Sequence, residues 1–144
     1  MTTAMKTLTI ALTIFGHIGA FAADPGYRKG TATILEVQAL PQFCWWEYDE
    51  RLAHTQSQLG DCGVGTNHYC PAYLDFLRAQ SALDRRKKLQ LLAVAQKEVE
   101  YTLKWVYERK NCPVRTHALA TYSNIRMMYT ILGVQLPPPK YVGP

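Results

Sequence analysis

Hydrophobic residues recur at helical spacing over most of the second half of the chain. Between residues 85 and 110 they follow steps of three and four, which is the spacing of one face of a helix. This first stripe has one polar member, Gln96, and it consists of Leu89, Leu92, Gln96, Val99, Leu103 and Val106. A second stripe follows Pro113, ends before Gly133, and consists of Val114, Ala118, Thr121, Ile125, Met128 and Leu132. The two stripes predict two long amphipathic helices.

Two prolines mark the starts of two earlier helices. Pro41 precedes a segment in which Cys44, Tyr48 and Leu52 would share one helical face, and a glycine-rich loop that begins near residue 60 ends it. Pro71 precedes an apolar segment up to residue 83. A single helix from Pro71 to residue 110 would be ~60 Å long, so we expect a break near Asp84, which can cap the next helix.

These segments predict the fold class. No alternation of the kind found in strands persists in residues 41–133, so we expect an all-α domain. Its four helices would form a small array of antiparallel hairpins.

Both ends of the chain lie outside this helical domain. Lys6, an apolar run over 8–21, and small residues at Ala20 and Ala22 are typical of a cleaved signal peptide, here residues 1–22. Residues 23–40 are expected to form an N-terminal arm, whose stretch from Thr33 fits either a short helix or a strand. Residues 134–144 contain three consecutive prolines and are expected to form an extended Pro-rich tail.

Length and charge limit the class of protein. A chain of 144 residues fits one domain, and its formal net charge of +5 is too diffuse to indicate nucleic-acid binding. No apolar run after the N-terminus approaches the length of a membrane span, so none is expected once the signal peptide is removed. We therefore expect a periplasmic or secreted protein.

The four cysteines carry the next prediction. An even number of cysteines in an exported chain indicates disulfides, and Cys44, Cys62, Cys70 and Cys112 allow three pairings. Helices that run up and down favour Cys44–Cys70 with Cys62–Cys112. The alternative is a metal site built from Cys62, His68 and Cys70, although their spacing matches no standard zinc pattern and the site would require free thiolates. The disulfide interpretation implies no metal and no cofactor.

Two sequence features are candidates for binding a partner. Trp45 and Trp46 are adjacent, so on a helix they point about 100° apart; we expect one in the core and the other at the surface. The basic run of Arg85, Arg86, Lys87 and Lys88 suits an acidic partner or peripheral contact with anionic headgroups, and it also fits a solvated helix start.

Leu40-Pro41-Gln42-Phe43-Cys44 followed by His68-Tyr69-Cys70 resembles a group of exported, uncharacterised proteobacterial proteins with tetratricopeptide-like helices. Tyr122-Ser-Asn-Ile125-Arg126-x-x-Tyr129 is similar to the first helix of a tetratricopeptide unit. The resemblance covers about residues 40–133, and it implies helical hairpins with a binding role and no catalytic residue. We therefore expect a non-catalytic protein–protein interaction module or an accessory subunit of an envelope complex, with another envelope or secreted protein as partner. The alternative function is periplasmic metal binding.

Overall fold

The computed structural model describes residues 32–60, 62–63 and 65–142. Over these residues the prediction of an all-α, disulfide-linked fold is confirmed. The expected signal peptide at 1–22 and the first part of the expected arm, 23–31, lie outside the described residues.

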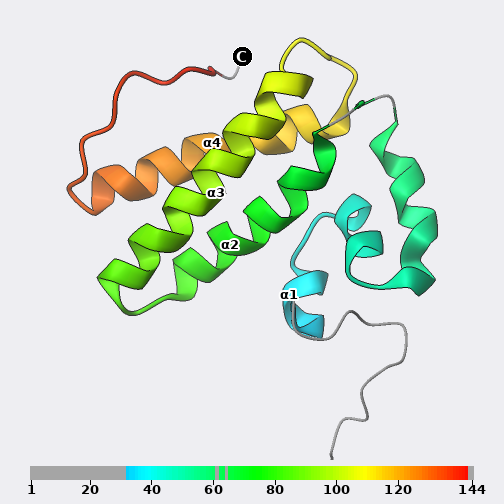
Figure 1. The fold of residues 1–144 in the computed structure, drawn as a ribbon, viewed down its shortest axis with the longest axis horizontal. Coiled ribbons are helices and arrows are strands. Elements are labelled where there is room, and N and C mark those ends of the chain that lie inside the picture. The colour runs from blue at the N-terminus through cyan, green and yellow to red at the C-terminus, as the bar shows by residue number, and fades with distance from the viewer. Residues whose placement is uncertain (1–31, 61, 64, 143–144) are drawn as a thin grey trace, which may run out of the picture.

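Three long helices form the main body of the protein: α2 (Tyr69–Ser81), α3 (Arg85–Val106) and α4 (Pro113–Ile131). Short connections turn α2 back into α3 and α3 back into α4, so the three helices make two successive hairpins (Figure 1). The expected break at Asp84 is confirmed, because its side chain accepts a hydrogen bond from the Lys87 backbone N–H at 2.6 Å and so caps α3.

Both predicted hydrophobic stripes face the interior of these hairpins. The fully or almost fully buried side chains of α3 and α4 include Leu92, Val99, Leu103, Val106, Val114, Ala118, Thr121 and Ile125. The buried face of α4 is wider than the stripe, since Leu119, Tyr122 and Tyr129 are also buried. The core therefore lies between α2, α3 and α4, where the 3.6-residue period of the sequence places it.

The segment after Pro41 departs from the predicted α-helix. It forms two 3₁₀ helices, η1 (Gln42–Glu47) and η2 (Glu50–Leu59). Between them Asp49 has extended backbone angles, and its carboxylate accepts from the Arg51 backbone N–H at 3.0 Å. This local cap begins a new helix instead of continuing the old one. The predicted face is nonetheless retained in part, because Cys44 and Tyr48 are buried.

The described part of the expected arm is packed against the body. Residues 34–38 form α1 (Ile34–Gln38), which resolves the choice between helix and strand. Thr33 and Glu36 make a reciprocal capping box at its start. Val37 and Leu40 are buried, so this segment belongs to the domain. We call residues 32–59, with α1, η1 and η2, the 3₁₀ layer; it lies beside α2 (Figure 1).

The Pro-rich tail is extended as predicted, and its described residues return over α3 and α4 (Figure 1). The Lys140 backbone N–H donates to the Tyr122 hydroxyl at 3.2 Å, and the Lys140 ammonium pairs with Glu100 at 3.0 Å. The Tyr141 ring packs against the rings of Tyr107 and Tyr122. The tail is thus held on the protein's own surface.

Candidate functional site

The two disulfides join the 3₁₀ layer and the following loop to the hairpins. Cys44 of η1 is bonded to Cys70 in the first turn of α2, with their Cα atoms 5.5 Å apart. Cys62 is bonded to Cys112, the N-cap of α4, with their Cα atoms 4.9 Å apart. The favoured pairing is confirmed. Disulfides of this kind persist in oxidising compartments, so the protein belongs outside the reducing cytoplasm.

The same two disulfides exclude the alternative of a metal site. Cys62 and Cys70 are both oxidised, each to a different partner, so neither supplies the thiolate that the site required. The third expected ligand, His68, has its Nδ1 atom 2.5 Å from Glu98. Cys62, His68 and Cys70 therefore do not form a metal site.

The two adjacent tryptophans do not divide into one core and one surface residue, and both are half-buried. Trp45 packs against the core, and its indole N–H donates to the Leu40 carbonyl at 3.0 Å. Trp46 instead lines a groove between η1 and α2. The 3₁₀ geometry explains the departure, because the predicted helical faces apply to α-helical spacing.

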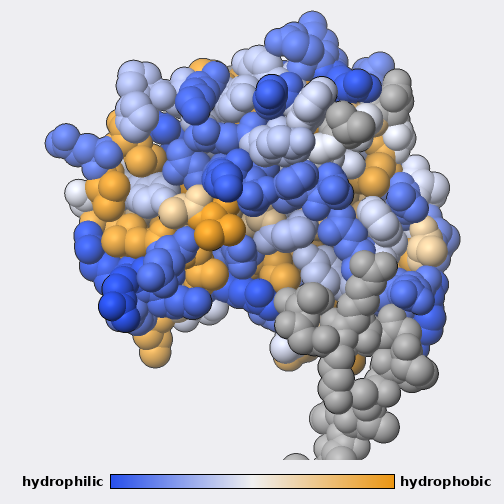
Figure 2. All heavy atoms as spheres, viewed as in Figure 1, coloured by the Kyte–Doolittle hydropathy of each residue, from blue (hydrophilic) through white to orange (hydrophobic). Residues whose placement is uncertain are grey.

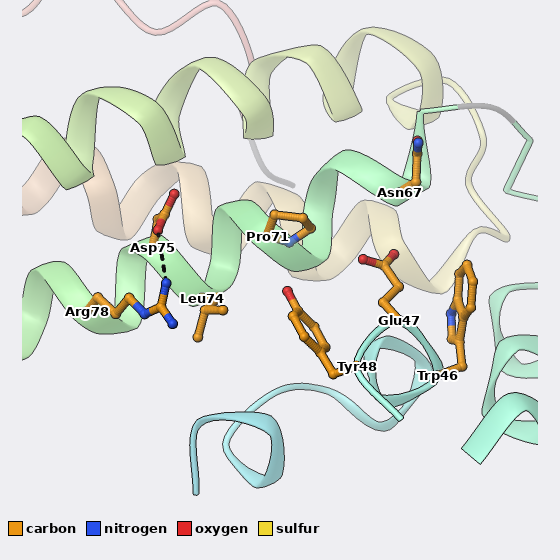
Figure 3. A pocket seen from close by; sticks show the side chains of 8 residues that line it. All are labelled: Trp46, Glu47, Tyr48, Asn67, Pro71, Leu74, Asp75 and Arg78. Atoms are coloured by element: carbon orange, nitrogen blue, oxygen red, sulfur yellow. Dashed lines mark ion pairs between the residues drawn. The ribbon is translucent and has the colours of Figure 1, made fainter. Parts of the chain in front are cut away.

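This groove, which we call the Trp46 groove, is built from residues of both the 3₁₀ layer and α2 (Figure 3). It has a volume of about 580 Å³ and is lined by Trp46, Glu47, Tyr48, Asn67, Pro71, Leu74, Asp75 and Arg78. Figure 3 shows Tyr48 pointing from the end of η1 toward Pro71 and Leu74 on α2. The floor is thus apolar and aromatic, and the rim carries charged groups, which is a common composition for a binding cleft.

Two hydrogen-bond donors in the wall of the Trp46 groove have no acceptor among the described residues. They are the indole N–H of Trp46 and the hydroxyl of Tyr48, and both polar atoms are buried. Burial raises the pKa of the Tyr48 hydroxyl, so this group stays protonated and remains a donor. A buried donor without a partner destabilises a protein by about 1–3 kcal/mol, and such groups are rare in native structures. Because both atoms are buried, an acceptor from outside the described residues could reach them only after a side-chain movement.

The charged rim of the groove is held in a fixed arrangement by Arg78. Its guanidinium makes two hydrogen bonds to Glu36 of α1, at 2.7 and 3.2 Å, and lies 3.9 Å from Asp75 (Figure 3). The hydrogen bond from Arg78 is the main reason that the pKa of Glu36 falls to about 2. Partial burial raises the pKa of Asp75 above its usual value. The rim of the groove thus carries the guanidinium of Arg78, which Glu36 positions from outside the lining, and the carboxyl group of Asp75.

The predicted basic residues lie elsewhere in the molecule. Arg85, Arg86, Lys87 and Lys88 form the first turn of α3, beyond the last turn of α2. Arg85 donates to the Leu132 carbonyl at 3.0 Å, which ties this turn to the end of α4. The predicted partner-binding residues therefore form no single site.

Sequence reasoning missed most of the Trp46 groove. Leu74, Asp75 and Arg78 come from the middle of α2, about 30 residues after Trp46, so no local motif joins them. The one available signal was the disulfide pairing, which brings η1 to the start of α2. An exposed aromatic pair on α3, Tyr101 and Trp105, was missed as well.

Comparison with protein-family models, with curated proteins and with solved structures found no match to this chain. The resemblance to exported tetratricopeptide-like proteins therefore stays a prediction. Within residues 32–60, 62–63 and 65–142, no helix has both the length and the apolar character that crossing a membrane requires.

Proposed function

We propose that this protein is a non-catalytic, exported helical interaction module, or an accessory subunit of an envelope complex, that holds a partner protein in the Trp46 groove. The observation that carries the proposal is a pair of buried donors, the Trp46 indole N–H and the Tyr48 hydroxyl, that find no acceptor within the part of the chain that the structure describes. Partner proteins offer the matching chemistry in every residue, because each backbone carbonyl is an acceptor.

Export is supported by two independent features. The N-terminal pattern of Lys6, an apolar run and small residues is typical of a secretory signal. The two disulfides fit an oxidising compartment. We place the protein in the periplasm or the extracellular medium, where its partner would be another exported protein.

The groove favours an extended peptide segment as the bound part of the partner. An apolar side chain of the segment would cover Pro71 and Leu74, which form the floor on the α2 side. A small rotation of Trp46 or Tyr48 would bring its buried donor to a backbone carbonyl of the segment. Because aromatic residues that close a desolvated cleft often dominate binding energy, we expect Trp46 to be the largest contributor.

The two tryptophans provide a matched pair of variants. Trp46→Phe removes a donor that has no acceptor among residues 32–60, 62–63 and 65–142, so it should leave the free energy of unfolding unchanged or raise it slightly. Trp45→Phe removes the hydrogen bond to the Leu40 carbonyl and should lower stability by about 1 kcal/mol. Partner affinity should change in the opposite order, with a loss for Trp46→Phe and none for Trp45→Phe.

The partner can be trapped with a photo-reactive amino acid placed in the groove. Asn67 is exposed and lines the groove, whereas Gln80 is exposed on α2 but lies outside the lining. In the native envelope, one defined adduct is expected from position 67 and none from position 80. Adding Tyr48→Phe should weaken that adduct while urea unfolding shows equal or greater stability. Equal adducts from both positions, or an adduct indifferent to Trp46→Phe and Tyr48→Phe, would refute the proposal.

A further inference from the structure

One end of the helical hairpins combines basic and apolar groups that the Trp46 groove does not use. The turn between α2 and α3 and the end of α4 lie together at the left of Figure 1, and the Arg85–Leu132 hydrogen bond joins them. In Figure 2 this end carries strongly hydrophilic surface beside protruding hydrophobic surface. We call it the basic end; it consists of Leu83, Arg85, Arg86, Lys87, Lys88 and Ile131.

The apolar members of the basic end project into solvent. Leu83, at the tip of the turn, is 101% exposed, and Ile131 is 75% exposed. Single exposed apolar residues are ordinary, but Leu83 is fully exposed and only Asp84 separates it in sequence from four consecutive cations. A protruding leucine close to a basic turn suits a soft surface that it can enter, rather than a rigid partner that must supply a pocket.

The four cations are placed against the preference of the helix that carries them. The N-terminus of a helix carries a partial positive charge, so acidic residues stabilise the first turn and basic residues destabilise it. The first turn of α3 has no acidic residue, and Arg85, Arg86, Lys87 and Lys88 fill it. Asp84 offsets this destabilisation only as the N-cap, where its carboxylate accepts a hydrogen bond from the Lys87 backbone N–H. A local arrangement that works against helix stability indicates a use for the charge outside the fold.

We propose that the basic end docks this protein on the surface of an anionic lipid membrane. The basic side chains would lie among the anionic headgroups, and Leu83 and Ile131 would enter the boundary with the acyl chains, as the apolar residues of interfacial helices do. Arg86 and Lys87 are exposed and can extend toward a surface, whereas Lys88 is half-buried and Arg85 is hydrogen-bonded to the Leu132 carbonyl. This inference does not rest on the proposed partner groove, because the two sites share no residue.

The test is binding of the exported, processed protein to lipid vesicles, measured by co-sedimentation. The processed form is used because an apolar leader would itself bind lipid. We expect binding to vesicles of phosphatidylglycerol and phosphatidylcholine in equal parts, and little binding to phosphatidylcholine alone. Each basic side chain near an anionic surface changes the partition coefficient about fivefold, so Arg86→Gln/Lys87→Gln should lower it about 25-fold. High salt should have a similar effect, since it screens exposed charges.

Matched variants separate docking from simple charge attraction. Lys97→Gln/Lys110→Gln removes the same net charge from exposed positions outside the basic end, and it should leave binding nearly unchanged. Leu83→Ser should weaken binding without affecting the fold, because the residue is fully exposed. Tyr48→Phe should have no effect on vesicles, so failure of the groove proposal and failure of this one are distinguishable.

Several outcomes would overturn the inference. Equal binding to neutral vesicles would show that charge plays no part, and equal loss in Lys97→Gln/Lys110→Gln would show that the basic end is not the docking surface. Suppression of vesicle binding by inorganic phosphate at constant ionic strength would indicate that the basic end binds a soluble anion. Absence of vesicle binding altogether would indicate that the ligand of the basic end is an acidic protein.

Discussion

The helical hairpins and the 3₁₀ layer are held together by different means. In α3 and α4 a continuous row of apolar side chains is buried along each helix. In η2, by contrast, Thr55 is the only buried residue among those described. The layer buries Val37, Leu40 and Phe43 in the common core, and it is also attached to α2 through the Cys44–Cys70 disulfide and the Arg78–Glu36 ion pair. The hairpins depend on packing along whole helices, whereas the layer combines fewer packed side chains with specific links to α2.

This difference bears on where a binding groove can form. Hairpins whose apolar faces pack against each other leave little space between them. The layer meets α2 with aromatic side chains from 3₁₀ helices, whose geometry is less regular, and two of its donors have no acceptor in the described part of the chain. The groove thus lies where this less regular layer meets α2.

The strongest effect should come from the core of the hairpins. Leu103→Ala deletes a side chain that is 0% exposed, so it removes buried apolar surface and leaves a cavity. We expect a loss of about 4 kcal/mol in the free energy of unfolding, measured by urea denaturation. Leu83→Ala is the matched control, because that leucine is fully exposed and its removal should change stability by less than about 0.5 kcal/mol. Similar losses in the two variants would mean that packing does not dominate the hairpins.

The second largest effect should come from removing the Cys44–Cys70 disulfide, which should destabilise the layer more than the hairpins. Cys44→Ala/Cys70→Ala opens a loop with a sequence separation of 26 residues, which should lower stability by about 3.5 kcal/mol. Because this bond attaches the layer, amide exchange should accelerate in residues 42–59 while α3 and α4 stay protected. Uniform loss of protection along the chain would show that the layer and the hairpins unfold as one unit.

The hairpins could be predicted from the sequence to a degree that the layer could not. Burial of Leu92, Val99 and Leu103 follows from their spacing alone, because an α-helix that packs on one side needs this period. The hydrogen bond by which Asp49 caps η2 competes with continuation of the preceding helix. The spacing of hydrophobic residues carries no information about such a cap. The groove is lined by side chains as far apart in sequence as Trp46 and Arg78, which share one lining only after the layer docks on α2. The groove is therefore formed by tertiary contacts, which local sequence preferences do not predict.

A third variant tests how closely the loop after the layer approaches the hairpins. Gly65 has φ +91°, and an added Cβ would lie 2.5 Å from the Trp105 ring on α3. Gly65→Ala combines backbone strain with this overlap, so we expect a loss of about 2–3 kcal/mol in thermal or urea unfolding. Gly133→Ala has similar strain at φ +72° but no atom within 4 Å, and it should lose about 1 kcal/mol. Equal losses would mean that the ring of Trp105 moves aside freely.

The smallest effect concerns the ion pair between the layer and α2. Arg78 lowers the pKa of Glu36 from 4.5 to about 2, so Glu36 stabilises the folded protein above pH 4.5, and this contribution is lost as the pH falls toward 2. Since both side chains are partly exposed, the pair should contribute less than about 1 kcal/mol. The difference in unfolding free energy between wild type and Glu36→Gln should therefore be constant above pH 5 and shrink below pH 4. A cycle with Arg78→Gln isolates the pair, because in that background Glu36→Gln should lose most of its pH dependence. A difference that persists unchanged at pH 2 would show that the charge of Glu36 does not stabilise the attachment of the layer, which would then depend on its buried side chains and its disulfide.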